Sequence, residues 1–321
     1  MKTITILVPC YNEENSLNIL YKHLQQVFTK VAGYNFCMLL IDDGSEDDTL
    51  GKMRELHEKD FMVSYLSLSR NFGKENAMMA GLDYAVGDAV ILMDADLQDP
   101  PELIPQMLQE WENGYEDVYA RRRTRAGESW LKKVSAYCYY RILRKFADID
   151  IPADVGDFRL LDRKAVDALC LLRERQRYTK GLFSWIGFKK KELLFDREPR
   201  LNGSSKMNIV KLLGLAIDGI TSFSVAPLRF ASILGVLISS IAFVYLIFII
   251  VKTVLYGDPV AGYPSLISII LFMGGIQLVV LGIIGEYVGR IFYEAKRRPD
   301  YLVREYNGKV IHLSEEGRYI K

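Results

Sequence analysis

Two long apolar stretches constrain what this chain can fold into more than any other feature. Residues 231–251 and 263–285 contain no charged side chain. At about 1.5 Å per helical residue, each stretch is long enough to cross the roughly 30 Å hydrocarbon core of a bilayer. A buried helix of a soluble protein seldom stays uncharged for so long, and two in tandem favour a transmembrane hairpin. We therefore predict a hairpin at residues 226–292, with spans at about 231–254 and 263–287.

The positive charges around these stretches predict their orientation. Arg229 precedes the first stretch, and a lone Lys252 lies beside the connecting loop. The cations after the second stretch are Arg290, Lys296, Arg297 and Arg298. Because cations accumulate on the cytoplasmic side of membrane spans, we expect both termini, the N-terminal domain (1–225) and the C-terminal tail (293–321) to be cytoplasmic. The chain would then be a two-span protein of the plasma or inner membrane.

The spacing of three glycines, the first residues, the cysteines and the net charge each indicate something about the partners of the protein or its cellular compartment. Gly282, Gly285 and Gly289 would permit close helix packing, within the hairpin or between protomers of a homo-oligomer. The first residues run directly into a strand pattern, so we expect no signal peptide. The four cysteines are widely spaced and form no CxxC pair, which is typical of reduced thiols. A formal net charge of +1 gives no reason to expect nucleic acid as a partner.

The first 113 residues alternate between apolar or β-branched runs and helical patterns. Strands are predicted at residues 3–8, 36–41, 63–68 and 89–93. Helices are predicted from the turn at 9–14 to about 31, at about 47–60, from the 70–74 loop through 84, and at 101–113, which has proline in its first turn. This alternation favours an α/β fold with a doubly wound, mostly parallel sheet.

The stretch AVILMDADLQDPP, residues 89–101, joins the fourth strand to a cluster of carboxylates. Alternation along an extended backbone would place Asp94 and Asp96 on one side and Ala95 on the other. Open α/β sheets bind ligands at the carboxyl ends of their strands. Two hard oxygen ligands there suit Mg²⁺ or Mn²⁺. A solvated acidic turn is the alternative interpretation of so short a motif.

Polar residues follow all four predicted strands, and a parallel sheet would bring them to one edge. That edge would carry an aromatic face, carboxylates able to hold a ribose or base, a cation and a metal site, which are the parts that a nucleotide diphosphate requires. The residues are Pro9, Tyr11, Glu13, Asp42, Asp43, Lys74, Asp94 and Asp96. No GxGxxG follows the first strand and no GxxxxGKS/T occurs, which argues against a dehydrogenase and a P-loop enzyme.

Two basic stretches lie between this domain and the hairpin. The patterns near residues 129–147 and 206–222 predict amphipathic helices at the membrane interface. For the first of them, an ordinary surface helix with a basic outer face is the alternative. A turn-rich loop at 197–206 adds three further cations. The tail from residue 301 onward could pack on the catalytic domain or stay mobile.

Seven features occur in an order that one enzyme family shares. They are VPCYNEENSL, IDDGSEDDT, RNFGKENAMMAGL, MDADLQDPPELI, VGDFRLLDRKAV, REPRLNGSSKM and the terminal two-helix hairpin. On these the chain resembles, over nearly its whole length, the inverting GT-A glycosyltransferases of family 2, and within them the polyprenyl-phosphate glycosyltransferases. Bacterial polyprenyl-phosphate glucosyl- and N-acetylglucosaminyltransferases share the two-span arrangement. The resemblance implies a GT-A catalytic domain with interfacial helices and a C-terminal transmembrane hairpin.

The resemblance also implies roles for residues at matching positions. Pro9, Tyr11, Glu13 and Asp42 would hold the nucleotide base and ribose, and Lys74 would lie near the base or diphosphate. Asp94 and Asp96 would bind the metal, Asp96 most directly, with Gln98 beside it. Asp157 occupies the position usually proposed as the catalytic base. The residues expected to grip the lipid phosphate and the diphosphate are Arg121, Arg200, Ser204 and Lys206; Arg121 and its two neighbours are not distinguished by spacing.

The implied reaction is inverting transfer of one sugar from a UDP-sugar, with glucose favoured, to undecaprenyl or another polyprenyl phosphate at the cytoplasmic face. The QxxRW segment of processive polysaccharide synthases is absent, which favours one sugar per encounter. UDP-N-acetylglucosamine is an alternative donor, as is GDP-mannose, used by dolichyl-phosphate mannose synthases. A protein- or polysaccharide-directed transferase is a further alternative. A catalytically inactive nucleotide-binding membrane scaffold is the alternative from another class.

Overall fold

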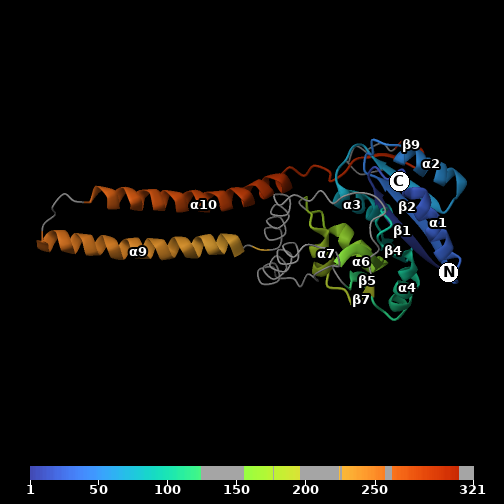
Figure 1. The fold of residues 1–321 in the computed structure, drawn as a ribbon, viewed down its shortest axis with the longest axis horizontal. Helices are drawn as coiled ribbons and strands as arrows, with labels where there is room; N and C mark the ends of the chain where they lie inside the picture. The colour runs from blue at the N-terminus through green and yellow to red at the C-terminus, as the bar shows by residue number, and fades with distance from the viewer. Residues whose placement is uncertain (124–154, 176, 196–223, 225, 257–261, 311–321) are drawn as a thin grey trace.

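The computed structural model describes the chain except for residues 124–154, 176, 196–223, 225, 257–261 and 311–321 (Figure 1). The two predicted interfacial helices, near 129–147 and 206–222, lie outside the described residues, as does the whole of the predicted 197–206 loop. The remaining segments form a globular part and a helical hairpin that projects from it (Figure 1).

Strands and helices alternate through the first third of the chain, as predicted. The elements are β1 (Lys2–Cys10), α1 (Leu17–Phe28), β2 (Tyr34–Asp42), α2 (Thr49–Lys59), β3 (Val63–Leu68), α3 (Lys74–Tyr84), β4 (Ala89–Leu92), the 3₁₀ turn η1 (Pro101–Leu103) and α4 (Ile104–Glu112). The later elements are β5 (Asp117–Arg122), β6 (Val155–Asp162), α6 (Arg163–Leu171), α7 (Thr179–Trp185), β7 (Lys190–Phe195), α9 (Ala226–Tyr256), α10 (Tyr263–Ala295), β8 (Val303–Tyr306) and β9 (Lys309–Val310).

The described strands form one nine-stranded sheet in the order β7-β5-β6-β4-β1-β2-β3-β8-β9. β1 pairs in parallel with β2 and β4, and β2 pairs in parallel with β3. β6 runs antiparallel to β4 and β5, and β8 runs antiparallel to β3. The mostly parallel, doubly wound sheet is therefore confirmed, with two reversed strands that the sequence pattern did not reveal.

Helices cover both faces of the sheet, and alternate strand residues enter two separate cores. Ile4, Ile6 and Val8 of β1 are buried with residues of α1, α2 and α4. Leu7 is buried on the opposite face with residues of α3, α6 and α7. A strand buried on both faces must be apolar at nearly every position, which is why β1 reads as a continuous apolar run. The central strands are thus held in place by both cores, which fixes where the loops at their carboxyl ends begin.

The helices α9 and α10 lie side by side and extend away from the sheet (Figure 1). Apolar windows at Pro227–Tyr245 and Phe272–Ala295 are long enough to cross a bilayer. Almost none of either window is buried within the described part of the chain. Exposing so large an apolar surface to water is unfavourable, so these helices need a lipid environment. Both predicted apolar helices are present.

After α10 the chain returns to the sheet. Arg297 adopts a left-handed backbone conformation (φ 47°) one residue beyond the C-cap of α10, which turns the chain out of the helix. β8 then pairs with the edge of β3. Glu305 of β8 accepts hydrogen bonds from Arg54 (3.0 and 2.7 Å) and from the hydroxyl of Tyr65 (2.7 Å). Residues 303–310 therefore pack on the sheet of the globular part.

Candidate active site

The carboxyl ends of the parallel strands meet at one edge, as the sequence predicted. Cys10 at the end of β1 lies opposite Asp42 at the end of β2. The amide of Asp43 donates to the carbonyl of Cys10 (2.9 Å), and the amide of Met93 donates to the carbonyl of Leu7 (3.1 Å). These bonds extend the ladder just past the strands. The loops that carry the candidate residues therefore leave the sheet side by side.

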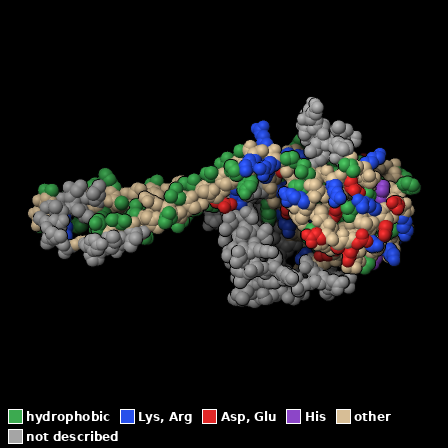
Figure 2. All heavy atoms as spheres, turned by 90° about the horizontal axis from the view of Figure 1, so that it is seen from above, with side chains coloured by type: hydrophobic (Ala, Val, Ile, Leu, Met, Phe, Trp, Pro, Cys, Tyr) green, Lys and Arg blue, Asp and Glu red, His purple; other side chains and the backbone are tan. Residues whose placement is uncertain are grey.

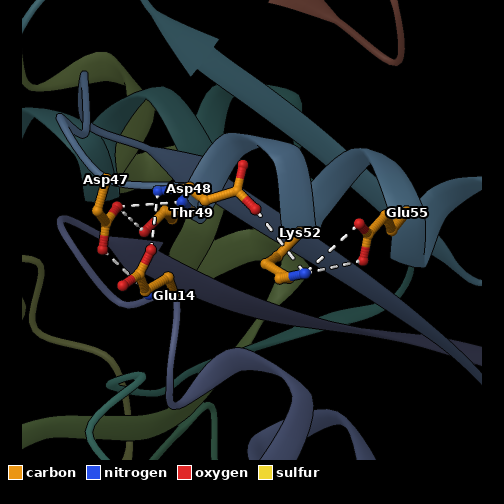
Figure 3. A network of polar contacts seen from close by, with 6 residues as sticks. All are labelled: Glu14, Asp47, Asp48, Thr49, Lys52 and Glu55. Atoms are coloured by element: carbon orange, nitrogen blue, oxygen red, sulfur yellow. Dashed lines mark hydrogen bonds and ion pairs between the residues drawn. The ribbon is translucent and has the colours of Figure 1, made fainter.

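The loop after β1 is bonded to the N-terminal end of α2 (Figure 3). The amide of Asp48 donates to the Glu14 carboxylate (3.0 Å), and the amide of Glu14 donates to Asp47 (3.3 Å). Asp47 also accepts from the amide and the hydroxyl of Thr49 (3.0 and 2.5 Å). Thr49 Oγ1 in turn accepts from the amide of Glu13 (2.8 Å). The network holds Glu13 in place without using its carboxylate.

The loop after β4 differs from the expected geometry. β4 ends at Leu92, and Ala95 and Asp96 lie in a turn. The prediction of an extended backbone through Asp96 is therefore wrong. Ala95 is buried in the core beneath α4, and Leu97 adopts a left-handed conformation (φ 60°). A left-handed backbone is unfavourable for leucine, and such strained residues cluster at functional sites. The turn, rather than strand alternation, sets the directions of the two aspartates.

Hydrogen bonds within this loop involve three aspartates and a glutamine. The amide of Asp94 donates to Asp99 Oδ2 (3.2 Å), and the amide of Gln98 donates to Asp96 Oδ1 (3.1 Å). Burial, together with the charges of Asp94 and Asp96, raises the pKa of Asp99 to about 7. Burial also raises the pKa of Glu13, a shift that the hydrogen bond from Ser16 opposes and the charges of Asp96 and Asp94 reinforce. Negative charge is therefore concentrated here.

Lys74 is the cation in direct contact with this cluster among the described residues. Its Nζ lies 2.6 Å from Asp94 Oδ1 and 2.6 Å from Asp157 Oδ2. Gly73, with a positive φ of 92°, is the N-cap of α3, and its amide and that of Phe72 donate to Asp43 (2.9 and 2.7 Å). Burial lowers the pKa of Lys74, but the two aspartates outweigh it, and the net shift is upward. Lys74 therefore stays protonated.

Asp157 enters the site from β6, the reversed strand beside β4. Burial raises its pKa, but the charges of Lys74, Lys180 and Arg159 outweigh burial and hold the pKa below its usual value. Two residues along, the buried Arg159 pairs with Asp117 (3.1 Å), and its guanidinium lies 3.6 Å from the centre of the Phe183 ring. This packing fixes the strand. Asp157 is thus a rigidly held carboxylate, ionised at neutral pH.

Two buried polar atoms at the site have no hydrogen-bond partner among the described residues: Asp157 Oδ1 and Gln98 Oε1. An unsatisfied buried polar atom costs about 1–3 kcal/mol, so native proteins keep few of them. Both atoms are acceptors, and both belong to residues that the sequence singled out. A ligand that carries a hydroxyl group or a positive charge would satisfy both atoms.

The residues present suit a divalent cation that is only partly held by protein. Asp94 and Asp96 supply hard oxygen donors. Burial is the main cause of the raised pKa values of Glu13 and Asp99, and the charges of Asp94 and Asp96 add to it, so a cation here would relieve part of the shift. No group of three or more His, Cys, Asp or Glu side chains is arranged to enclose a metal within the described ranges. Mg²⁺ is commonly bound by one or two carboxylates together with substrate phosphates. The donor set therefore fits a metal completed by a diphosphate.

Other predicted residues are placed as follows. Asp42 is buried and accepts from the amide of Ser45 (2.9 Å) and the hydroxyl of Ser67 (2.8 Å). Pro9 belongs to β1, and Tyr11 is exposed beyond its end. Arg121, on β5, forms an ion pair with Glu192 (2.9 Å). Arg200, Ser204 and Lys206 lie outside the described residues.

Two acids of the site accept hydrogen bonds from the backbone. The sequence pattern placed Asp43 among the polar residues of the sheet edge and gave Asp99 no role. Asp43 holds the backbone that begins α3, and Asp99 accepts from the backbone of Asp94. Both acids follow apolar strands within the quoted motifs, so their positions were visible. The signal that was missing is burial, which distinguishes an acid that supports a loop from one that meets a ligand.

Comparison with known families agrees with this arrangement. The sequence model described as "Glycosyl transferase family 2" matches residues 5–170, and the one described as "GtrB C-terminal hairpin" matches residues 226–291. The chain therefore belongs to glycosyl transferase family 2: it is a glycosyltransferase with a GT-A fold. The matched hairpin coincides with α9 and most of α10, and the protein is a membrane protein.

Several relatives match almost from end to end. A protein of Synechocystis named "Uncharacterized glycosyltransferase" is 47% identical, covering 94% of this chain and 95% of its own. The "Bactoprenol glucosyl transferase" of Shigella phage SfV is 43% identical, covering 94% of this chain and 98% of its own. The "Prophage bactoprenol glucosyl transferase homolog" of Escherichia coli K12 is 42% identical with the same two coverages.

Proposed function

We propose that this enzyme transfers a single glucose from UDP-glucose to a polyprenyl phosphate, with inversion, at the cytoplasmic face of the membrane. The observation that carries the proposal is the cluster of Lys74, Asp94, Asp96 and Asp157 at the strand ends of a chain that also has a transmembrane hairpin. Near-full-length relatives named bactoprenol glucosyl transferase support both the acceptor and the sugar.

The reaction is an in-line displacement. An oxygen of the lipid phosphate attacks the anomeric carbon of the donor, a new carbon–oxygen bond forms, and the bond to the β-phosphate of UDP breaks. The electron pair of that bond leaves with UDP. A phosphate monoester has a second pKa of about 6, so the attacking group is already largely dianionic at neutral pH. The site therefore has to position two anions more than it has to remove a proton.

The charged residues have different proposed roles in this reaction. Lys74 keeps its positive charge between two carboxylates, so it can orient the donor's diphosphate beside Asp94. Asp157, held ionised, positions the acceptor or the sugar through its unpaired Oδ1. Asp94 and Asp96 would hold Mg²⁺ or Mn²⁺, which when bound neutralises charge on the UDP leaving group. We propose that the base and ribose are held by Pro9, Tyr11, Glu13 and Asp42. Gln98 is proposed to lie beside the metal.

Membrane orientation supports the lipid acceptor. The cations beside both outer ends of the hairpin favour a cytoplasmic catalytic domain. A lipid phosphate is confined to the membrane interface, where this anchor would hold the site. Arg121, Arg200, Ser204 and Lys206 are proposed to grip phosphate there. A Cβ added to Gly282, Gly285 or Gly289 would meet nothing within 4 Å among the described residues, which leaves these positions open for a second protomer.

A labelled-donor assay tests the function. Membranes that contain the enzyme are incubated separately with radiolabelled UDP-glucose, UDP-N-acetylglucosamine and GDP-mannose, and lipids are extracted into organic solvent. We expect label in the lipid fraction from UDP-glucose and not from membranes that carry the Asp96→Ala variant. Label entering lipid from another donor would replace glucose with that sugar. Absence of both lipid labelling and UDP release with every donor would favour an inactive nucleotide-binding scaffold.

A further inference from the structure

A cavity of about 490 Å³ lies where the end of α10 meets the globular part of the protein. Its volume falls in the range of about 300–1,000 Å³ that small-molecule sites occupy. Three separate segments line it: the end of α3 with Asp83, the segment after α6 with Arg173 and Arg175, and the end of α10 and the residues that follow, with Glu294, Arg297 and Arg298. None of these residues belongs to the proposed transferase site.

The cavity is separate from that site. Lys74 begins α3 and Asp83 lies in its last turn, so the two sites are at opposite ends of an 11-residue helix, about 15 Å apart along its axis. Lys74 faces the strand ends of the sheet, whereas Asp83 faces the chain as it leaves the membrane hairpin. A ligand in the cavity would therefore not compete with the sugar nucleotide.

Hydrogen bonds already hold the walls of the cavity in place. Arg173 forms two bonds to the carboxylate of Asp83 (2.7 and 2.8 Å), which also accepts from the hydroxyl of Tyr301 (2.6 Å). The amide of Arg175 donates to Glu294 of α10 (2.8 Å), and the Arg175 guanidinium donates to the carbonyl of Arg298. These bonds join the hairpin to the catalytic domain. The cavity is thus a preformed feature of that joint.

Its charge favours an anion. Four arginines and three carboxylates line the cavity. The charge of Arg173 is matched by Asp83. The side chains of Arg297 and Arg298 are exposed and form no ion pair with a carboxylate in the described part of the chain. The left-handed backbone of Arg297 is unfavourable for a residue with a side chain, yet it brings this pair of arginines to the cavity.

The position of the cavity favours a lipid. The apolar window of α10 ends at Ala295, two residues before Arg297. Cations immediately beyond a membrane span lie at the depth of the phospholipid headgroups. Figure 2 shows Lys and Arg side chains gathered where the apolar hairpin joins the globular part. A phosphate carried by a membrane lipid would therefore be delivered to the cavity, whereas a soluble anion would have to be captured from the cytoplasm.

We propose that this cavity binds the phosphodiester headgroup of an anionic phospholipid, with Arg297 and Arg298 contacting the phosphate. Arginine forms charge-assisted hydrogen bonds to phosphate oxygens, and basic pockets beside transmembrane helices on the cytoplasmic side bind anionic headgroups. A lipid bound there touches both the hairpin and the catalytic domain. It would hold the catalytic domain against the membrane.

The test uses the full-length protein in a non-ionic detergent and native mass spectrometry. The protein is titrated with phosphatidylglycerol, with phosphatidylcholine and, separately, with phosphatidylglycerol in the presence of inorganic phosphate. The double variant R297Q/R298Q removes two positive charges from the cavity. The matched control R304Q/K309Q removes two positive charges from β8 and β9, at positions that do not line it. Thermal melting verifies that each variant is folded.

We expect one saturable phosphatidylglycerol on the wild type and on R304Q/K309Q, and binding weakened by about tenfold or more in R297Q/R298Q, as the loss of two interfacial cations implies. Phosphatidylcholine should not saturate this site. Equal affinity in R297Q/R298Q and the wild type would overturn the proposal, and so would an equal loss in both double variants. Displacement of the lipid by an equal concentration of inorganic phosphate would assign the site to a free anion instead. Sugar transfer is not part of the readout, so the outcome is independent of the proposed function.

Discussion

Lys74 contacts two carboxylates that have different proposed tasks. At 2.6 Å from each, it neutralises Asp94, a proposed metal ligand, and Asp157, which we propose positions the acceptor or the sugar. Without a cation between them, these carboxylates would repel one another across a partly buried site. The arrangement explains how the two acids can lie close together. Because the carboxylates have different proposed tasks, each task can be tested by a separate substitution.

Asp96→Ala should abolish turnover. The variant removes one carboxylate of the proposed metal site, and the charge on the leaving diphosphate then lacks several kcal/mol of stabilisation, so we expect a loss of about 100-fold or more. The measurement is transfer of labelled sugar to lipid over a series of Mg²⁺ and Mn²⁺ concentrations. Asp167→Ala, an exposed acid on α6, is the matched control and should keep wild-type activity. Full activity of Asp96→Ala, or of the wild type in EDTA, would show the metal assignment to be wrong.

Asp157→Asn should lower the transfer rate by the same factor at every pH. The pKa of Asp157 is held below its usual value, so the carboxylate is a weak base, and the lipid phosphate has little need of one. The amide retains an acceptor oxygen but loses the charge that pairs with Lys74. The measurement is the pH–rate profile of the variant divided by that of the wild type. A ratio that rises with pH would instead assign Asp157 the role of a general base.

At the scale of elements, β8 joins the end of the hairpin to the catalytic sheet. Val303 and Glu305 of β8 are buried, as is Tyr301 just before the strand. Glu305 is a charged residue on the inward face, and its burial is compatible with folding because Arg54 and Tyr65 both donate to it. The pairing of β8 with β3 also covers a sheet edge that would otherwise expose unpaired backbone groups.

Glu305→Gln should destabilise the fold, and the effect should depend on pH. The hydrogen bonds from Arg54 are the main cause that holds the pKa of Glu305 below its ordinary value, against burial. A carboxylate with a depressed folded pKa stabilises the protein fully above its unfolded value and loses that contribution as pH falls through the folded value. We expect a cost of about 1 kcal/mol or more at pH 7.

The melting temperatures of the wild type and Glu305→Gln should therefore differ at pH 7 and converge progressively as the pH falls below about 4.3, the ordinary pKa of a glutamate. Scanning fluorimetry in detergent measures both. Glu102→Gln, an exposed acid beside α4, is the control and should melt with the wild type throughout. A difference that persists unchanged into acid would mean that shape rather than charge determines the contribution of Glu305.

At the scale of the whole molecule, the hairpin and the sheet form one chain path. The chain leaves the globular part through α9, returns through α10 and re-enters the sheet at β8 (Figure 1). Both ends of the hairpin are therefore on the same side of the membrane as the catalytic domain. The cation distribution alone predicts which side of the membrane this is, and that prediction can be tested directly.

Cysteine labelling should show that the connecting loop is external. Asp258→Cys lies between α9 and α10, and Lys309→Cys lies on β9, so the two should be on opposite sides of the membrane. A membrane-impermeant maleimide added to intact cells should label Asp258→Cys and should label Lys309→Cys only after permeabilisation. The parent protein with its native cysteines replaced provides the background. The reverse labelling pattern would place the catalytic domain outside and exclude a cytoplasmic sugar nucleotide as donor.

The elements that were predicted well are those whose signal is local. β3 has the predicted bounds, and α3 ends at the predicted residue, because the apolar run of a buried strand and the apolar pattern of a helix are properties of neighbouring residues. The reversed strands β6 and β8 were missed as sheet members because a strand's partner and direction depend on segments far away. β8 pairs with β3 across more than two hundred residues of sequence, and its inward glutamate obscured the apolar alternation.

By itself the sequence determined the membrane hairpin, the winding of the central strands and the set of polar residues at their carboxyl ends, because hydrophobic periodicity and span length are properties of contiguous residues. Only the tertiary structure decided how those polar residues meet. Lys74 bridges Asp94 and Asp157 because α3, β4 and β6 converge, and Asp99 has a raised pKa because the turn after β4 buries it. Distances and burial arise from the packing of separate segments, and a charge acquires its role from what surrounds it in space.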